Sequence, residues 1–321
     1  MKMEIPVPDA AQADQARELR NCLAGGNAVL ARVTPILEHL LSNPDHSLFS
    51  DEIVARIRGM CHDLAWQILR AQAEATGEAG REAFADKHGE ALAQHFFTSP
   101  RILAHCHGLA LEWQLATRME TQYGIDPVLS PLLQTLIASP DSGQASAAMG
   151  ALAAQARFAQ SQRRMELSLA ELPGDLFHEL LLGWRNFGGD RRSDAMIRAE
   201  AKLRNAYDES SARLSLLARL VAGLGEEVSK ALDVEQAGVA LFLTALAARS
   251  NQSRNLAVLA TNERQVARLA LALRGCGLDA AEANSQILRL HPRSSPQGGL
   301  DAITPAEAKK WLAEAGTMGV V

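Results

Sequence analysis

Aromatic residues are scarce in this chain of 321 residues: they make up 4% of it, although 47% of the residues are hydrophobic. The core must therefore be built mainly from Ala and Leu, which are among the strongest helix formers. No run of β-branched residues alternates with polar residues at period two, so the pattern that predicts a strand is missing. Together these absences exclude a sheet protein and predict an all-α fold.

Cysteine pairs and long apolar runs are also missing. Cys22, Cys61, Cys106 and Cys276 lie far apart and form no CxxC motif, which is typical of reduced, mostly buried thiols. The longest apolar runs, such as 239–243, are far too short to span a bilayer. The N-terminus shows no apolar segment of a secretory signal. We therefore expect a cytoplasmic protein without a membrane partner.

The charge balance and the glycine pattern exclude further classes. A net charge of −5 and a pI near 6.0 argue against a nucleic-acid partner bound through an overall basic field. The glycines form neither GxGxxG nor GxxxxGK[ST], and GxSxG is absent, so neither a phosphate loop nor a serine nucleophile elbow is predicted. We predict no catalytic residue and no cofactor. Enzymatic activity stays open, and a non-enzymatic role is favoured.

The most informative stretch that is present runs from Asp126 to Phe158. Four leucines recur at steps of three and four residues, which places them on one helix face: Leu129, Leu132, Leu133 and Leu136. Residues 139–143 (SPDSG) then favour a turn. A second helical run follows, with an inner face that we assign to Ala145, Ala148, Met149 and Leu152. The pattern predicts two helices joined as an antiparallel hairpin.

An earlier stretch repeats this pattern. The prolines and aliphatic pairs of 34–45 match those of 130–141 at an offset of 96, from Pro35 to Pro131 and from Asp45 to Asp141. A later stretch, 239–260, has the same order of apolar helix, polar turn and apolar helix, but lacks both prolines. A match at a fixed offset is typical of helical repeats, although two Leu-rich helix faces can also match by chance.

Glycine, proline and capping residues divide the chain further. Gly25 and Gly26 are expected to stop a first helix that begins at Ala10. Ser99 before Pro100, and Thr304 three residues before Glu307, are typical of helix starts. We predict a lead-in with the first helix (1–27), an N-terminal helical-repeat region (28–170), a C-terminal helical region (171–290), and a linker with a terminal helix (291–321).

Residues 126–158 resemble a HEAT-type repeat, a Pro-Leu-rich helix that turns at an Asp into an Ala-Leu-rich helix. The residues that match this motif are Pro131, Leu132, Leu133, Leu136, Asp141, Ala148, Ala151 and Leu152. The basic residue that is common early in the second helix is replaced by Ser146. More broadly, 171–185, 237–250 and 268–278 resemble an uncharacterised bacterial family, domain of unknown function 2336. That resemblance implies an all-helical, HEAT-like fold and brings no activity or catalytic residue.

Histidines and carboxylates gather in the segment from Asp86 to Glu112. His88 and His95 are seven residues apart, as are His105 and Glu112, so each pair can share a helix face. If the two helices pack together, these four residues are candidate metal ligands. No HxxxH or ExxH motif supports them, and surface or core histidines are the alternative. Cys106 lies between His105 and His107, but neighbours in sequence diverge by about 100° on a helix and form no catalytic pair.

A contact surface is predicted around residues 184–198. Its candidate residues are Trp184, Arg185, Phe187, Arg191, Arg192 and Arg198. Aromatic and arginine side chains are frequent anchors of interfaces, whereas Trp66 and Trp113 are expected in the core. The charged helix expected over 190–208 can meet an acidic partner or form a homodimer, but mixed charges at helical spacing also describe a solvated face.

These observations predict degenerate HEAT-like hairpins that form an α-solenoid or a compact helical array. The function we infer is a non-enzymatic scaffold or adaptor that binds a protein or peptide partner. The alternative is a helical ligand- or metal-binding protein or enzyme, with its site between hairpins near residues 95–112.

Overall fold

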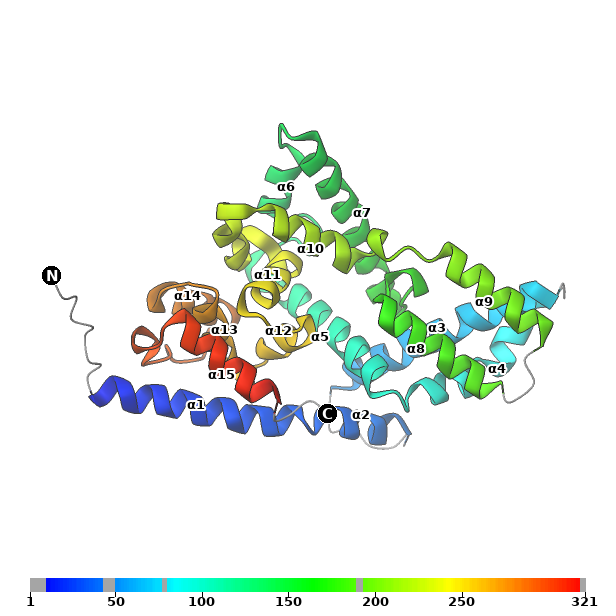
Figure 1. Ribbon diagram of the computed structural model, residues 1–321, viewed down its shortest axis with the longest axis horizontal. Coiled ribbons are helices and arrows are strands. Elements are labelled where there is room, and N and C mark those ends of the chain that lie inside the picture. Colours follow the sequence, from blue (N-terminus) through cyan, green and yellow to red (C-terminus); the bar gives the residue numbers. More distant parts are fainter. Residues whose placement is uncertain (1–9, 43–49, 77–79, 189–192, 318–321) are drawn as a thin grey trace. The chain divides into compact units, whose positions relative to one another are not determined.

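The computed structural model describes residues 10–42, 50–76, 80–188 and 193–317. Within these ranges all regular structure is helical, with fifteen α-helices and five short 3-10 helices (Figure 1). The all-α prediction is therefore confirmed. None of the helices in the described ranges has both the length and the apolar character needed to cross a membrane.

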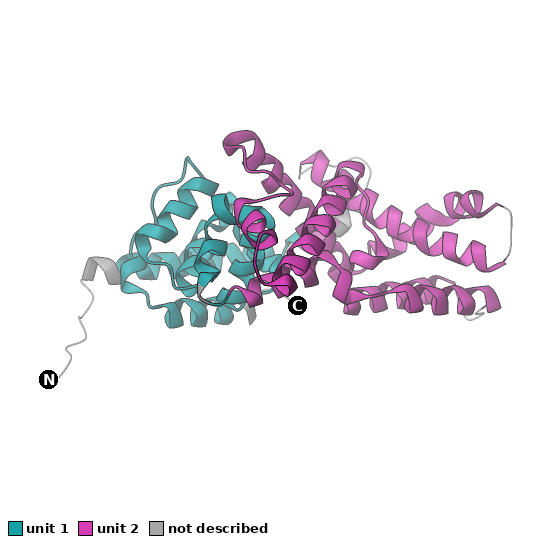
Figure 2. Ribbon diagram, turned by 90° about the horizontal axis from the view of Figure 1, so that it is seen from above, with its two compact units in different colours: residues 1–33, 225–321 teal, residues 34–224 magenta. Residues whose placement is uncertain are grey.

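The chain forms two compact units, which are distinguished by colour in Figure 2. Unit 1 combines residues 1–33 with 225–321, and unit 2 consists of residues 34–224. The boundaries predicted after residues 170 and 290 divide the chain differently. Local composition marks a linker, whereas these units are defined by contacts between distant segments.

Unit 1 is built around one apolar helix, α13. The helical elements of unit 1 are α1 (Ala10–Leu30), η3 (Gly225–Leu232), α11 (Val234–Ser250), α12 (Arg254–Ala260), η4 (Glu263–Gln265), α13 (Val266–Gly275), α14 (Ala280–Leu290), η5 (Leu300–Ala302) and α15 (Pro305–Thr317). Residues 269–273 of α13 are fully buried, because α13 contacts α1, α11, α12, α14 and α15. The apolar run 269–273 places apolar side chains on every side of this part of α13, which suits a central position.

Helix α1 differs from its predicted length. We expected Gly25 and Gly26 to end it, but it continues to Leu30, so that prediction was wrong. Gly26 has a different role, because a Cβ at this position would lie 2.5 Å from Oε1 of Gln265. Gly26 thus permits a close helix contact, whereas at helix ends glycine is favoured for its left-handed backbone.

Unit 2 contains the remaining elements. They are α2 (Val33–Ser42), which begins at the unit boundary, α3 (Asp51–Thr76), α4 (Arg81–Phe96), α5 (Pro100–Tyr123), α6 (Pro131–Ile137), α7 (Ser142–Arg164), η1 (Leu169–Glu171), α8 (Gly174–Phe187), α9 (Asp194–Ala206), η2 (Glu209–Ser211) and α10 (Arg213–Gly223). Helix α3 contacts α4, α5 and α9. Its contact with α9 joins segments more than one hundred residues apart, since Arg198 donates to the backbone oxygen of Ala75.

Capping residues fix several helix starts in unit 2. The Ser99 hydroxyl accepts from the Ile102 N–H at the start of α5. The Ser130 hydroxyl does the same for Leu133 at the start of α6. In each case proline is the first helical residue, where no N–H is needed. These starts follow from local sequence alone.

The hairpin predicted over 126–158 is present, with α6 packed against α7 (Figure 1). Leu129, which we placed on the first helix, lies before α6, so that assignment was wrong: the Ser130 cap and Pro131 start the helix later. Asp141 caps α7 by accepting from Gly143 and Gln144. The buried face of α7 consists of Ala148, Ala151, Ala154, Gln155, Phe158, Ala159 and Gln162. Met149, which we assigned to this face, is 52% exposed, so that assignment was wrong. Helix α7 also contacts α10 and α5, and these neighbours help to decide which of its faces is buried.

The two other copies of the pattern are only partly comparable. In the earlier copy Pro35 lies inside α2, and Asp45 lies outside the described residues. In the later copy α11 and α12 contact each other across a turn in which Asn251 has a left-handed backbone, with φ of 58°. Asparagine tolerates this conformation better than most residues, which explains why the turn needs no proline.

Candidate functional site

A buried ion pair lies at the centre of unit 2. Arg213, the first residue of α10, donates from Nη1 to Oε1 of Glu112 on α5 at 2.8 Å and from Nη2 to Oε2 at 2.9 Å. The two side chains are 3% and 1% exposed. Two parallel bonds between a guanidinium and a carboxylate are the strongest arrangement available to this pair.

Further contacts hold Arg213 in place. Its Nη1 also donates to Oε1 of Gln155 at 3.1 Å, and its guanidinium lies 3.7 Å from the ring centroid of Phe158. Its backbone N–H donates to Oε2 of Glu171 at 2.7 Å, which satisfies one free donor of α10 in place of a cap, since the preceding residue is Ala212. The ion pair thus joins α5, α7, η1 and α10.

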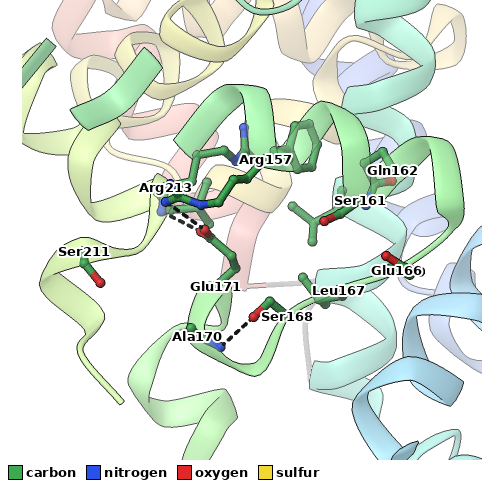
Figure 3. A pocket seen from close by; sticks show the side chains of 13 residues that line it. Arg157, Ser161, Gln162, Glu166, Leu167, Ser168, Ala170, Glu171, Ser211 and Arg213 are labelled. Atoms are coloured by element: carbon green, nitrogen blue, oxygen red, sulfur yellow. Dashed lines mark hydrogen bonds and ion pairs between the residues drawn. The ribbon is translucent and has the colours of Figure 1, made fainter. Parts of the chain in front are cut away.

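A small pocket adjoins this ion pair and has a volume of about 170 Å³ (Figure 3). Its walls come from α5, α7, the segment 166–171 and the start of α10. The lining residues are Leu109, Arg157, Phe158, Ser161, Gln162, Glu166, Leu167, Ser168, Ala170, Glu171, Ser211, Arg213 and Leu214. Pockets for drug-sized ligands span roughly 300–1,000 Å³, so this one suits a single small group.

The pocket presents both charges and hydroxyl groups. Arg157 is the exposed cation: its side chain is 58% exposed and its Nη2 lies 3.6 Å from Oε1 of Glu171. The carboxylate of Glu171 contacts both the guanidinium of Arg157 and the backbone N–H of Arg213 (Figure 3). Ser161 and Ser211 add hydroxyl groups that can donate or accept. The mixture favours a polar group able to make both kinds of hydrogen bond.

One wall of the pocket is held by a row of residues on α3. Asp63 accepts from the Leu167 N–H at 2.9 Å, while Gln67 donates to the Leu167 oxygen and accepts from the Leu169 N–H. Gly59 lies against Met165, where a Cβ would meet the Met165 oxygen at 2.6 Å. Residues 59, 63 and 67 share one helix face, so a single face holds the segment 165–169, which leads from α7 into η1.

Asp63 is half-buried in this row. Burial raises the pKa of its carboxyl, and the hydrogen bond from the Leu167 N–H acts in the opposite direction. Desolvation therefore outweighs hydrogen bonding at Asp63.

The four candidate metal ligands are not brought together. His88 packs beside Phe84 at 4.8 Å between ring centroids, and His95 lies 6.0 Å from the ring of Phe187. His105 is buried on α5, and both carboxylate oxygens of Glu112 accept from Arg213. No group of three or more His, Cys, Asp or Glu residues in the described ranges is placed to hold a metal ion.

Two neighbours of these residues on α5, Cys106 and His107, are buried and are not activated for catalysis. Burial lowers the pKa of His107 to about 4, so its imidazole is neutral at pH 7. The Cys106 sulfur lies 4.0 Å from that of Cys61, and both are fully buried. The contact with Cys106, followed by burial, raises the pKa of Cys61 well above its usual value, which disfavours the reactive thiolate.

The predicted contact surface is divided between the core and internal ion pairs. Trp184 is 1% exposed and donates from Nε1 to Gln72 at 3.2 Å, so its ring belongs to the core. Arg185 pairs with Glu200 on α9, with Nε donating to Oε2 at 2.6 Å. Phe187 is 39% exposed.

The remaining basic residues of that surface lie on or before α9. Arg198 donates to the oxygen of Ala75, and Arg191 and Arg192 lie outside the described residues. Lys202 pairs with Glu74 at 2.8 Å, and Arg204 pairs with Glu200 at 2.8 Å. Much of the charge on α9 therefore pairs within unit 2.

Sequence reasoning did not find Arg213. It lies 101 residues from Glu112, and no local motif connects the two. The only available signal was Glu112 itself, a carboxylate in a segment of strong helical periodicity, where a buried charge requires a partner.

No family model, curated protein or solved structure matches this chain.

Proposed function

We propose that the chain is a non-enzymatic helical-repeat scaffold or adaptor that binds a protein or peptide partner. The observation that carries this proposal is the pocket beside Arg213, whose volume of about 170 Å³ suits one short side chain of a partner. The paired helices α6–α7 and α11–α12 support the repeat part of the proposal.

The pocket has walls that are already ordered. The Glu112–Arg213 pair fixes one side, and the bonds from Asp63 and Gln67 to the segment 167–169 fix another. A site that is ordered before binding loses less conformational entropy on association. This favours recognition of a short segment by a rigid surface.

The lining chemistry selects the side chain that binds. Arg213 is neutralised by Glu112, whereas Glu166, Glu171 and Arg157 leave opposite charges around the pocket. A charged side chain of either sign would meet a like charge there. We therefore propose that a short uncharged polar side chain, an amide or a hydroxyl, enters the pocket.

Selection from a displayed random-peptide library tests this proposal. Ser161→Leu on α7 fills the pocket, while Ser146→Leu places the same side chain on an exposed position of the same helix. We expect selected peptides to lose about tenfold or more in affinity with Ser161→Leu, because about 1.4 kcal/mol or more of binding is removed. Fluorescence anisotropy measures the affinities. Equal binding by both variants would contradict the proposal.

A small-molecule ligand is the second candidate. Leu109 lines the pocket, so the cavity borders the segment 95–112 in which a ligand site was expected. A thermal-shift screen with small polar compounds separates the two candidates. A compound that raises the Tm of the wild type and of Ser146→Leu, but not of Ser161→Leu, would favour this second function.

A further inference from the structure

Helix α1 is held in unit 1 by a narrow stripe of residues. Between Asp14 and Val29 the buried positions are Leu19, Leu23, Gly26 and Asn27, and almost all the others are exposed. These four residues recur at steps of four, three and one along one helix face. Only two of them contribute a large apolar side chain.

The surface that receives α1, here called the seat, is formed by residues 263–315. Arg20 pairs with Glu314 at 3.0 Å and lies over the ring of Trp311 at 5.4 Å. Gly299, with φ of 75°, lets Gln15 approach so closely that a Cβ there would lie 2.8 Å from that of Gln15. The seat therefore matches α1 over most of its length.

The centre of the seat is polar. Arg268 is 1% exposed and donates to the amide oxygen of Asn27 and, at 2.7 Å, to that of Gln252. Asn27 in turn donates to the Ala315 oxygen at 2.8 Å. Within the described residues, no carboxylate forms an ion pair with Arg268, and neither its Nε nor Oε1 of Gln265 has a hydrogen-bond partner.

This polar centre positions α1 without holding it strongly. A buried cation that is matched only by amides, together with unsatisfied polar atoms, is unfavourable compared with its hydrated state. When α1 leaves, Arg268 and Gln265 become accessible to water. Release of α1 exposes Leu19 and Leu23 to water, which is unfavourable. Hydration of Arg268 and Gln265 offsets part of that cost in free energy.

The course of the chain also favours release. In the sequence, the whole of unit 2 (residues 34–224) lies between α1 and the rest of unit 1. Only the turn at Ala31 and Arg32 joins α1 to α2. An element that is joined through a short turn and docked on residues distant in sequence can be exchanged between identical chains.

We propose that α1 is an exchangeable arm and that the seat at 263–315 binds α1 of a second copy of this chain. The second copy supplies the same Gln15, Arg20, Gly26 and Asn27 at the same spacing, so every contact of the seat is restored and no new contact is required. An unrelated amphipathic helix would restore only the apolar part.

Cross-linking between two different full-length variants tests the proposal. One chain carries Arg20→Cys and the other carries Glu314→Cys, and both carry Cys22→Ser to remove the exposed native thiol. The other cysteines are buried. A short bismaleimide can then join positions 20 and 314 only between chains. We expect a covalent heterodimer whose yield rises with protein concentration.

Two matched substitutions test whether the heterodimer forms through the close contact between α1 and Gln265. Gly26→Val, added to the Arg20→Cys chain, would meet Gln265, whereas a Cβ at Gly25 has no atom within 4 Å. We expect loss of the heterodimer with Gly26→Val and its retention with Gly25→Val.

Two results would overturn the proposal. One is the absence of a heterodimer at every concentration, combined with an intramolecular link in a single chain that carries both cysteines. The other is equal cross-linking of the two valine variants. Circular dichroism confirms that each variant keeps its helical content.

Discussion

Two buried arginines, one in each unit, have opposite surroundings. Arg213 of unit 2 meets a carboxylate through two parallel bonds and lies on an aromatic ring. Arg268 of unit 1 meets two amide oxygens, and burial lowers its pKa to about 10, so it is still charged at neutral pH. The first arrangement compensates the buried charge, and the second leaves much of it uncompensated.

The difference separates two uses of a buried cation. In unit 2 the ion pair joins four elements, and removal of either partner leaves the other charge buried without a compensating partner. In unit 1 the cation specifies where Asn27 lies, and hence the register of α1, at a cost in stability. Buried polar groups that fix register in this way are known from other helical proteins.

Removal of Arg213 is expected to have the largest effect on the free energy of unfolding. Arg213→Met leaves the Glu112 carboxylate buried without its partner, so we expect the free energy of unfolding to fall by about 3–5 kcal/mol. Urea denaturation followed by circular dichroism measures it. The double variant Glu112→Leu with Arg213→Met is the control, and we expect it to recover most of the loss. A small effect of the single variant would show that the buried pair contributes little to the stability of unit 2.

A second test concerns His107, a buried base on the same helix as Glu112. Its folded pKa of about 4 lies below the ordinary value of 6.5, so the unfolded chain binds a proton first as the pH falls. Above pH 6.5 the imidazole is neutral in both the folded and the unfolded chain, so it does not oppose folding. As the pH falls from 6.5 towards 4, we expect the free energy of unfolding to fall by about 3 kcal/mol. Unfolding free energies of the wild type and His107→Leu across this range measure it. Parallel pH profiles of the two proteins would contradict the assignment.

Removal of Arg268 should have a smaller effect than removal of Arg213. Arg268→Met relieves the uncompensated charge but leaves the amide oxygens of Asn27 and Gln252 without a donor. These terms oppose each other, and we expect the unfolding free energy to change by less than about 2 kcal/mol. The same urea titration applies. A loss as large as that of Arg213→Met would remove the contrast between the two units.

The smallest effect distinguishes two adjacent glycines of α1. Gly25→Ala places a methyl group in open space within a helix, and we expect a gain of up to about 1 kcal/mol. Gly26→Ala brings the same helix propensity but meets Gln265, so we expect no gain. Thermal unfolding of the two variants side by side measures the difference. Equal gains would show that Gly26 is not in a close contact.

Features that depend on a few neighbouring residues were predictable from the sequence. Ser99 before Pro100, and Thr304 paired with Glu307, begin helices where expected. The turn at Asp141 is also where the pattern placed it. In each case the donor and the acceptor lie within a few residues of each other, so the sequence contains the whole interaction.

Features that depend on distant residues were not predictable. Gly26 lies within a helix at a point where Gln265 approaches it, and that contact joins residues 239 positions apart. The exposure of Met149 and the burial of Trp184 depend on which neighbouring helix covers each face. The Glu112–Arg213 pair, around which the candidate site is built, belongs to the same class.

The position of α1 has a consequence for synthesis of the chain on the ribosome. Helix α1 leaves the ribosome before the residues that contact it, which are Arg268, Trp311, Glu314 and Ala315. Unit 2 can complete its own contacts earlier, because its residues end at Leu224. Throughout that interval α1 has no seat in its own chain. On each nascent chain the α1 segment therefore has no seat until residues 263–315 have been made, so undocked α1 segments coexist on neighbouring chains of one messenger RNA.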